Sequence, residues 1–403
     1  MYVPIAPKRV AWEMEHMDVH PAGIALMAPK AEILPLKVLA VRSPAANILK
    51  QEMLAMGGDC VTARGAINCS VDRGDVILLG SRKQYAHLVQ KLQSMAGWFG
   101  IQNIIEDIRQ FLEDEELKTV LADGRVLTYE KMRIMGILNV TPDSFYAGSR
   151  VGAADALLQK AGTMLEQGAD ILDIGGESTR PGAEPVPVEE EIRRVTGALE
   201  QIKKHYPAAI CSVDTYHAAT AKAALACGAD IINDVTAGTG DPAMVPVATE
   251  AGAPLVLMHM RGTPRTMAQP ENKVYHNVIE DVAVYLLQRA QACKTAGLGK
   301  EKLILDPGIG FAKDVAQNLA LAANLDALTH HGMPVLLAAS RKGCIGKVLG
   351  GLPPEERLEG TLAFSAAAVY GGARLVRVHD IKENVRMIRM LEGILSWQQR
   401  MSD

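Results

Sequence analysis

The fold of this chain is decided by the segment Arg133 to Gly148, which reads RIMGILNVTPDSFYAG. It runs from an apolar, β-prone stretch into a polar loop that carries Asn139 and Asp143. Pro142 can neither continue a helix nor donate a ladder hydrogen bond, so we expect the strand to stop just before it. This is the layout of a buried strand that delivers functional groups at its carboxyl end, although taken alone it is better explained as an ordinary polar turn.

The rest of the chain repeats this layout. After Lys131, eight short apolar runs alternate with segments of helical pattern; the runs read IMGILNV, DILDIGG, AICSVDT, DIINDV, PLVLMHM, KLILDPG, PVLLAAS and LVRVHD. Continuous Val, Ile and Leu runs are typical of parallel strands covered on both faces, and parallel strands require helical crossovers. We therefore predict an α/β fold with a (β/α)8 TIM barrel over residues 130–398. A doubly wound sheet is the alternative, but it would require neither eight units nor polar strand ends.

The preceding residues predict a smaller unit. Residues 1–35 are rich in Pro, Met and Ala without a sustained period, and we interpret them as an arm that either lies on a neighbouring surface or is partly disordered. Residues 36–125 contain two strand-like runs, LKVLAV and DVILLGS, and three helical stretches, which predicts a small α/β domain of unknown role. The DG pair and the polar TYEK near residues 123–131 mark its boundary.

Composition places the chain among proteins that act on small molecules. Its 403 residues exceed the about 250 to 300 at which single cores stop growing, so two domains are expected. A formal charge of -4 with interspersed signs argues against binding nucleic acid or an anionic membrane. Six cysteines without a CxxC pair are expected to be reduced thiols of a cytoplasmic protein. No apolar segment reaches the about 18 residues that span a bilayer.

Polar or charged side chains follow every one of the eight runs. A single Asp at a strand end usually caps the next helix, and a lone Arg is usually solvated, but eight such ends in one fold are harder to explain in this way. Barrel enzymes assemble their active sites at the carboxyl ends of the strands. In chain order the candidates are Asn139 and Asp143; Glu177, Ser178, Thr179 and Arg180; Asp214 and Thr215; Asn233 and Asp234; His259 and Arg261; Asp306; Ser340, Arg341 and Lys342; and Arg377 and His379.

The candidates fall into two chemical groups. One offers mixed acceptors and donors that suit a flat heterocycle with amide and amino edges. The other offers cations and donors that suit a phosphate or diphosphate. A neutral oxygen donor such as Asn139 can also bind Mg²⁺, which usually reaches proteins together with substrate phosphates. The first group is Asp214, Asn233, Asp306 and Lys342, and the second is Ser178, Thr179, Arg180, Arg377 and His379.

The same motifs closely resemble, in order and spacing, those of the dihydropteroate synthase family. They are MGILNVTPDSF, DIGGESTRPG, SVDT, INDV, LMHMRGTP, LDPGIGFAK, ASRKG and RVHD, and the resemblance covers residues 132–395. Several motifs in one order are far more specific than a single short pattern. Members of this family join 4-aminobenzoate to 6-hydroxymethyl-7,8-dihydropterin diphosphate, release diphosphate and form 7,8-dihydropteroate for folate biosynthesis. They are the target of sulfonamides.

The resemblance implies roles for the residues at matching positions. It implies that Asn139 contacts Mg²⁺ and the diphosphate. It also implies that the pterin edges meet Asp214, Asn233 and Asp306. Lys342 would lie along the pterin, Arg377 would stack over it, His379 would bind the diphosphate and Ser340 would hold the aminobenzoate carboxylate. The loops after the first two strands would close around the second substrate through Asp143, Phe145, Thr179, Arg180 and Pro181.

The family chemistry implied here is SN1-like. The diphosphate leaves first, assisted by Mg²⁺, His379 and Arg180, and the aryl amine then captures the pterin methylene cation. Asp306 and Asp143 can stabilise that cation electrostatically. The apolar stripe TLAFSAAAVYGG, in the predicted helix Glu355 to Tyr370, can be explained by packing on the barrel, but with the resemblance it favours a homodimer through the last helices.

Three features depart from the family pattern. The run from Tyr146 to Ser149 stands where the family usually has a Ser-Asp-Gly-Gly-like run, and MAQPEN after His259 departs from the usual Met-Gln pattern. Residues 1–125 have no place in the minimal enzyme and resemble an extension of some bacterial members.

Two other functions remain open. A pterin-binding methyltransferase that serves a corrinoid protein would have no use for STRPG, SRKG or RVHD. A non-catalytic pterin-binding or scaffolding protein is opposed by the intact Asn139, Arg180, Lys342 and His379.

Overall fold

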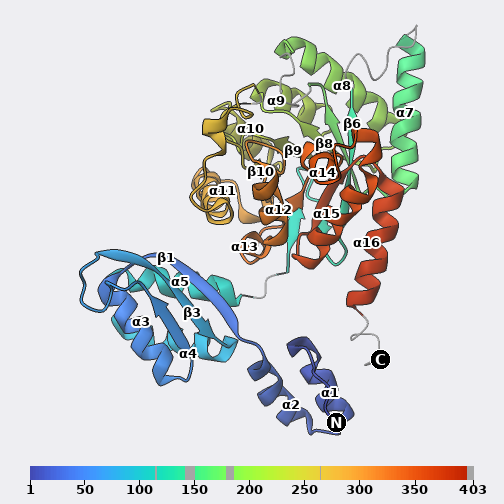
Figure 1. Cartoon of the computed structure of the whole chain (residues 1–403). Coiled ribbons are helices and arrows are strands. Elements are labelled where there is room, and N and C mark those ends of the chain that lie inside the picture. Colours follow the sequence, from blue (N-terminus) through green and yellow to red (C-terminus); the bar gives the residue numbers. More distant parts are fainter. Residues whose placement is uncertain (114–115, 141–149, 178–185, 264, 397–403) are drawn as a thin grey trace. The chain divides into compact units, whose positions relative to one another are not determined.

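The computed structural model describes residues 1–113, 116–140, 150–177, 186–263 and 265–396 (Figure 1). The chain forms two compact units, the first built mainly from Met1–Glu115 and the second from Glu116–Leu395. Each has its own buried apolar core. The prediction of a larger α/β unit preceded by a smaller one therefore agrees with the structure.

The second unit is a barrel of eight parallel strands, as predicted. The strands neighbour one another in the order β11-β10-β9-β8-β7-β6-β13-β12, and a parallel bridge from Leu305 to Val335 completes the ring between β11 and β12. Each apolar run of the sequence supplies one strand. The bounds are β6 (Arg133–Asn139), β7 (Ile171–Gly175), β8 (Ile210–Asp214), β9 (Ile231–Asp234), β10 (Leu255–Met258), β11 (Leu303–Asp306), β12 (Leu336–Leu337) and β13 (Leu375–Val378).

Helices connect the strands and cover the outside of the barrel (Figure 1). Helix α8 (Val188–His205) shows why they form: three glutamates occupy its first turn and Lys203, Lys204 and His205 its last, which complements the helix dipole, while Leu199 and Ile202 are buried. The others are α7 (Arg150–Glu166), α9 (Ala218–Ala226), α10 (Met244–Ala251), α11 (Val278–Thr295), α12 (Val315–Ala323), α13 (Asp326–Thr329), α14 (Gly343–Val348), α15 (Leu358–Tyr370) and α16 (Ile381–Leu395). Within the described ranges, no helix combines the length and the apolarity needed to cross a membrane.

The barrel interior has an apolar floor below a polar layer. The floor is a buried cluster to which most strands contribute a residue near their start: Met135, Ile171, Ile231, Val256, Ile304, Leu336 and Leu375. Side chains alternate along a strand, so the residue two positions later lies on the same face. Those later residues include Asp173, Asn233, Asp306 and Arg377. The change from apolar to polar along each strand thus creates a polar site above a packed base.

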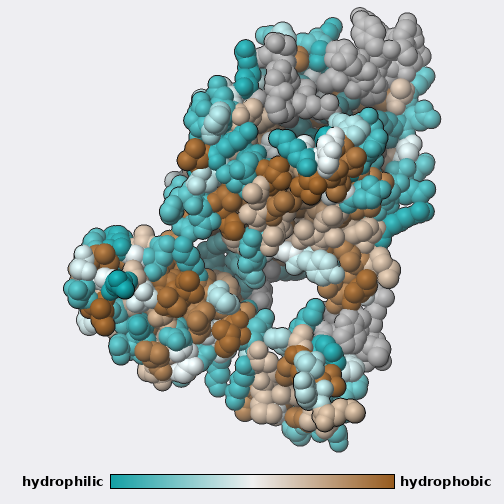
Figure 2. All heavy atoms as spheres, in the orientation of Figure 1, coloured by the Kyte–Doolittle hydropathy of each residue, from teal (hydrophilic) through white to brown (hydrophobic). Residues whose placement is uncertain are grey.

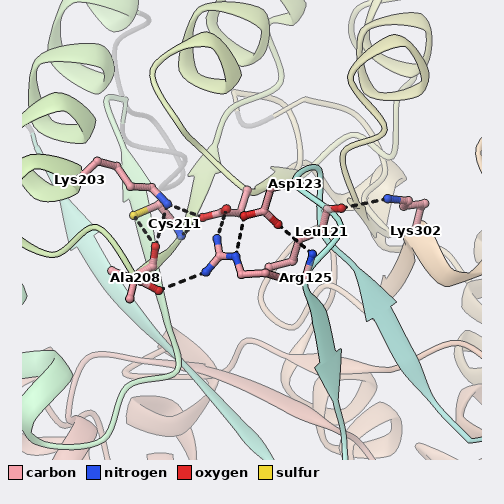
Figure 3. Close-up of polar contacts among 9 residues, drawn as sticks. Leu121, Asp123, Arg125, Lys203, Ala208, Cys211 and Lys302 are labelled. Carbon is pink, nitrogen blue, oxygen red and sulfur yellow. Dashed lines mark hydrogen bonds and ion pairs between the residues drawn. The ribbon is translucent and has the colours of Figure 1, made fainter.

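A hairpin closes the amino-terminal end of the barrel. Strands β4 (Lys118–Val120) and β5 (Val126–Thr128) pair antiparallel, and Leu121, Leu127 and Tyr129 join the floor cluster. Polar contacts hold the hairpin: Arg125 Nη2 lies 2.6 Å from Asp230 Oδ1, and Lys302 Nζ donates to the Leu121 carbonyl at 3.2 Å. Figure 3 shows Arg125, Leu121 and Lys302 in these contacts. The barrel unit therefore begins at Glu116 rather than at residue 130, because residues 116–129 pack into it.

The first unit contains a three-stranded antiparallel sheet with helices. Strand β3 (Arg73–Gly80) lies between β1 (Leu34–Arg42) and β2 (Asp59–Thr62). Alternate residues face the helices, so Leu78 is buried while its neighbour Ile77 is 38% exposed. Tyr85 is fully buried and its hydroxyl donates to the Leu78 carbonyl at 2.9 Å. The helices that pack with this sheet are α3 (Ser43–Ala55), α4 (Arg82–Leu92) and α5 (Ile101–Leu112). The sequence predicted these three helices and the strands β1 and β3, but not β2.

The residues before this sheet are helical. Residues 1–35 show no sustained hydrophobic period, yet α1 (Val10–His16) and α2 (Pro21–Met27) form there. Pro21 opens α2 at a position where its missing N–H is not needed, and His20 Nδ1 accepts the Ala22 amide at 3.2 Å. No residue of either helix is fully buried, which explains why an amphipathic pattern is missing from the sequence.

Candidate active site

A cavity of about 1040 Å³ is lined by strand-end residues and by the loops that follow β11 and β12. Eight of the predicted candidate residues line it: Asn139, Glu177, Asp214, Ser340, Arg341, Lys342, Arg377 and His379. Two more, Asn233 and Asp306, are buried in the polar layer of the barrel. Six others, Asp143, Phe145, Ser178, Thr179, Arg180 and Pro181, fall outside the described residues.

Two carboxylates hold Arg377 in the barrel interior. Its Nε lies 2.5 Å from Asp173 Oδ2 and its Nη2 lies 2.6 Å from Asp214 Oδ2. Asn233 Nδ2 donates to the same Asp173 oxygen at 3.1 Å. Burial raises the pKa of Asp214, and the Asp173 charge adds to this, while Arg377 opposes it. The sequence predicted that Arg377 helps to bind the anion, but in the structure its charge is already paired with two carboxylates. Asp173 was not among the residues predicted from the sequence.

Asp306 and Lys342 interact electrostatically, and each carries a shifted pKa. Asp306 Oδ1 accepts the Gly308 amide at 2.7 Å, and burial raises the pKa of this carboxyl to about 6 despite the nearby lysines and arginine. Burial lowers the pKa of Lys342 to about 8, with Arg377 contributing in the same direction. The Lys342 ammonium lies over the Phe311 ring, 4.3 Å from its centroid. Gly310 makes room, since a Cβ there would lie 3.1 Å from Lys342 Cδ.

Ser340 and His379 form a directed pair at the ends of β12 and β13. The Ser340 hydroxyl oxygen accepts the His379 backbone N–H at 3.2 Å and lies 2.9 Å from His379 Nδ1. A hydroxyl that accepts one hydrogen bond can donate its own proton to Nδ1, which leaves the Nε2–H of a neutral ring free to donate. Burial, with Arg377 adding to it, lowers the pKa of His379 to about 3. The ring therefore offers a hydrogen bond rather than a positive charge.

The backbone between Ser340 and Lys342 is braced in an uncommon conformation. Arg341 has a φ of +56°, the left-handed region that side chains other than glycine rarely adopt. Its Nε lies 3.0 Å from Asp380 Oδ2, its amide donates to Thr361 Oγ1 at 3.0 Å, and its carbonyl accepts from Arg357 at 2.9 Å. These contacts fix the turn that points Ser340 and Lys342 toward the cavity.

A buried lysine that sequence reasoning missed ties two loops together. Lys313 is 6% exposed, and its ammonium lies within 3.2 Å of His259 Nδ1 and of the carbonyls of His259, Gly308 and Phe311. Burial lowers the pKa of His259 to about 2, and the nearby Lys313 charge acts in the same direction, so the ring is a neutral acceptor. His259 therefore serves the loop structure. The signal in the sequence was a lysine at the end of the apolar motif LDPGIGFAK.

Two other residues named from the sequence, Arg261 and Glu177, already have partners. Arg261 pairs with Asp281 at 3.2 Å and lies over the Tyr275 ring, 3.8 Å from its centroid. Glu177, Glu191 and His217 place ligand-type atoms within 4.8 Å of one another. Glu191 already accepts from Thr220 at 2.7 Å and lies 2.8 Å from His217 Nδ1, and Tyr216 donates to Glu177 at 3.1 Å. We interpret Glu177, Glu191 and His217 as a hydrogen-bonded cluster that links the loops after β7 and β8.

Asn139 offers a neutral oxygen at the rim of the cavity. Its strand partner is Gly175, where an added Cβ would lie 3.4 Å from Asn139 Oδ1. Among the described residues, the Glu177 group is the single set of three acidic, His or Cys ligands that gather closely, so Asn139 has no such cage around it. A hard cation that keeps waters and arrives with a diphosphate suits this kind of position.

Comparison with known proteins shows the same combination of fold and motifs. The "Pterin binding enzyme" family matches residues 135–379. Dihydropteroate synthase of Bacillus subtilis is 46% identical over 283 residues, covering 70% of this chain and 95% of that protein.

Two solved structures are also similar. The Xanthomonas albilineans dihydropteroate synthase with 4-aminobenzoic acid is 39% identical, with a TM-score of 0.64 over 70% of this chain and 99% of that one. The Burkholderia cenocepacia enzyme complexed with 7,8-dihydropteroate is 37% identical, with a TM-score of 0.63 over 71% and 99%. On this evidence the chain belongs to the dihydropteroate synthase family of pterin-binding enzymes.

Proposed function

We propose that this chain condenses 6-hydroxymethyl-7,8-dihydropterin diphosphate with 4-aminobenzoate to give 7,8-dihydropteroate and diphosphate. The observation that carries the proposal is the gathering of Asn139, Asp214, Ser340, Lys342 and His379 around one cavity. That cavity combines buried acceptors for a heterocycle with donors for an anion. The ligands named for the Xanthomonas and Burkholderia relatives, 4-aminobenzoic acid and 7,8-dihydropteroate, are one substrate and the product of this reaction.

The pterin is assigned to the polar layer of the barrel. Asp214 Oδ1 is buried and lacks a hydrogen-bond partner among the described residues. An unpaired buried carboxylate oxygen is unfavourable by about 1–3 kcal/mol or more, so a ligand N–H that reaches it is bound strongly. Asn233 and Asp306 add acceptors beside it, and the Lys342 stem covers the ring.

The diphosphate and the aminobenzoate are assigned to the outer part of the cavity. His379 offers its Nε2–H to a diphosphate oxygen. Ser340 is the proposed partner of the aminobenzoate carboxylate through its backbone N–H, because its hydroxyl proton is donated to His379 Nδ1. Asn139 would hold Mg²⁺, which when bound neutralises charge on the diphosphate. Arg180, Thr179, Pro181, Asp143 and Phe145 are assigned to the two loops that complete this part, on the strength of the motif match alone.

The reaction breaks the bond between the pterin methylene carbon and the diphosphate oxygen, and the bonding pair leaves with the diphosphate. His379 donates to that departing oxygen anion, while the carboxylates of Asp214 and Asp306 lie near the positive charge that spreads into the pterin ring. The aryl amine then supplies its lone pair to the methylene carbon and loses a proton to solvent. An aryl amine is already nucleophilic at neutral pH, so this SN1-like course requires no strong base.

We further propose that the protein works as a cytoplasmic homodimer. Figure 2 shows hydrophobic side chains gathered over α12, α14 and α15, where Leu319, Val348 and Leu349 are each at least 42% exposed. Tyr370, at the end of α15, is 64% exposed. A patch of this kind is typical of an interface between copies. Analytical ultracentrifugation measures the oligomeric state, and particles of 43 kDa alone would contradict the dimer.

The test of activity is direct. Purified protein is mixed with Mg²⁺, the dihydropterin diphosphate and 4-aminobenzoate, and dihydropteroate and diphosphate are measured. Lys342→Ala should lower kcat/KM by at least about 100-fold, because it removes both the cover of the ring and a buried cation. Lys222→Ala, which removes an exposed lysine of α9, is the matched control and should react like the unaltered protein. Pterin binding without product would instead favour a methyltransferase or a non-catalytic binder.

A further inference from the structure

The buried carboxylate of Asp173 has no place in the roles assigned so far. It lies in the middle of β7, is 0% exposed, and shares the inward face with Ile171 below it. Its Oδ2 accepts from Arg377 Nε at 2.5 Å and from Asn233 Nδ2 at 3.1 Å. Burying a charge in this way is expensive unless it is paired, so the position requires an explanation.

The contact with Asn233 decides which way that amide points. A carboxylate oxygen only accepts hydrogen bonds, so Asn233 must turn its NH₂ group toward Asp173. Its Oδ1 is then directed away from Asp173, and its second N–H is left beside it. Asn233 thus presents an acceptor and a donor in a fixed order, and a rotated amide would set its oxygen against the Asp173 oxygen.

The contact with Arg377 likewise fixes the orientation of a side chain. Asp173 and Asp214 engage two different nitrogens of the guanidinium, at 2.5 and 2.6 Å, and so fix its plane. Arg377 and Asp214 both line the cavity. Asp173, completely buried itself, therefore contacts Arg377, which lines the cavity, and Asn233, which lies in the polar layer of the barrel.

We infer that Asp173 is a positioning and specificity residue that sets the hydrogen-bond polarity of the pterin pocket through Asn233 and Arg377. The inference rests on the proposed function, since it takes the pterin as the ligand. Its consequence is selectivity: a fixed acceptor at Asn233 Oδ1 favours a ring that presents N–H groups over one that presents a carbonyl at the same edge.

Direct binding separates this inference from the proposed function. The probes are 6-hydroxymethylpterin and 6-hydroxymethyllumazine, in which a carbonyl oxygen replaces the 2-amino group, and each is titrated by calorimetry into the full-length protein. Asp173→Asn keeps the shape but can present either an oxygen or an NH₂ group, so Asn233 becomes free to rotate. The variant should bind the pterin about tenfold more weakly and lose about tenfold in preference for pterin over lumazine.

The neighbouring Ser212 provides the matched control. It is the strand partner of Asp173 in β8 and is also 0% exposed, and its hydroxyl has no partner among the described residues. Ser212→Ala should therefore leave both affinity and preference unchanged. A double-mutant cycle with Asn233→Ala adds a second check, because Asp173→Asn should affect the preference little once the Asn233 amide is absent.

Each outcome is decisive. Equal losses in Asp173→Asn and Ser212→Ala, an unchanged preference, or additive effects in the cycle would overturn the inference. Unfolding of Asp173→Asn together with Asp173→Glu, seen by circular dichroism, would overturn it as well, since it would assign Asp173 to stability alone. If the unaltered protein binds neither probe, the proposed function fails first.

Discussion

The two units of this chain bury very different side chains. The first unit, Met1–Glu115, is the extension that precedes the barrel. Its described residues contribute only Ser43 and Ser81 as buried polar groups. Both bind the backbone: Ser43 donates to the Val71 carbonyl at 2.5 Å, and Ser81 caps α4. The barrel buries ionisable groups in number, among them Asp173, Asp306 and Lys313.

This difference separates a unit built for packing from one built for chemistry. Buried charges reduce stability unless they are paired, so a fold retains them where a ligand or a reaction requires them. The extension has an apolar core and a capping box at the start of α4, features that serve folding alone. On this ground we assign binding to the barrel and a structural role to the extension.

The largest effect should come from cutting the chain at two nearby points. A variant that starts at residue 116 keeps the hairpin and should retain turnover. A variant that starts at residue 130 loses Leu121, Leu127 and Tyr129 from the floor cluster. At about 1.5–3 kcal/mol for each large apolar side chain, that loss approaches the about 5–15 kcal/mol that stabilises a whole domain. Thermal unfolding and solubility are the measurements; if both truncated proteins unfold alike, the extension is not a separate unit.

A smaller effect is expected from Leu78→Ala in the centre of the extension. Leu78 is 0% exposed, and truncating such a residue destabilises its own unit by about 2–5 kcal/mol. Protease sensitivity of residues 34–112 should rise, while kcat and KM for the barrel reaction stay unchanged. Ile77→Ala, on the exposed face of the same strand, is the control. A fall in kcat with Leu78→Ala would contradict the separation of roles.

The affinity of the barrel for the pterin should depend on pH, by at most about tenfold per pH unit, because buried ionisable groups bind the ligand. Burial raises the pKa of Asp306 to about 6, and Lys342, Lys313 and Arg377 are the cations that face it. Above that pH the carboxylate accepts ligand N–H groups, and as the pH falls from 7 to 5 it gains a proton and the acceptor is lost. Pterin affinity, measured by calorimetry, should fall over this window. Asp306→Asn should bind more weakly at pH 7 and show a smaller pH dependence, with the remainder due to Asp214, whose pKa burial also raises.

Much of the barrel could be predicted because buried parallel strands appear as uninterrupted apolar runs. The polar residues at the ends of those runs were also visible, and eight of them line the cavity. Asp173 was missed because it lies inside the run DILDIGG, where only the two-residue period of a strand reveals that it shares a face with Ile171. Lys313 was missed because it approaches His259 through folding, far from it in sequence.

The hairpin and β2 were missed for a different reason. Strands of three or four residues carry almost no periodicity, so Lys118–Val120, Val126–Thr128 and Asp59–Thr62 gave little signal. The turn residues Asp123 and Gly124 between the apolar residues on either side did carry a hairpin signal. It was interpreted as a domain boundary because nothing local indicates that Leu121 packs against distant strands.

The hairpin also bears on how the chain acquires its structure during synthesis. Leu121, Leu127 and Tyr129 leave the ribosome early, but their burial partners extend to Leu336 and Leu375. Contacts across more than two hundred residues form slowly, because a long loop must close before they stabilise anything. The apolar side chains of the hairpin therefore stay exposed until the last strands are made. We expect the nascent chain to be most prone to aggregation, and most dependent on chaperones, during this interval.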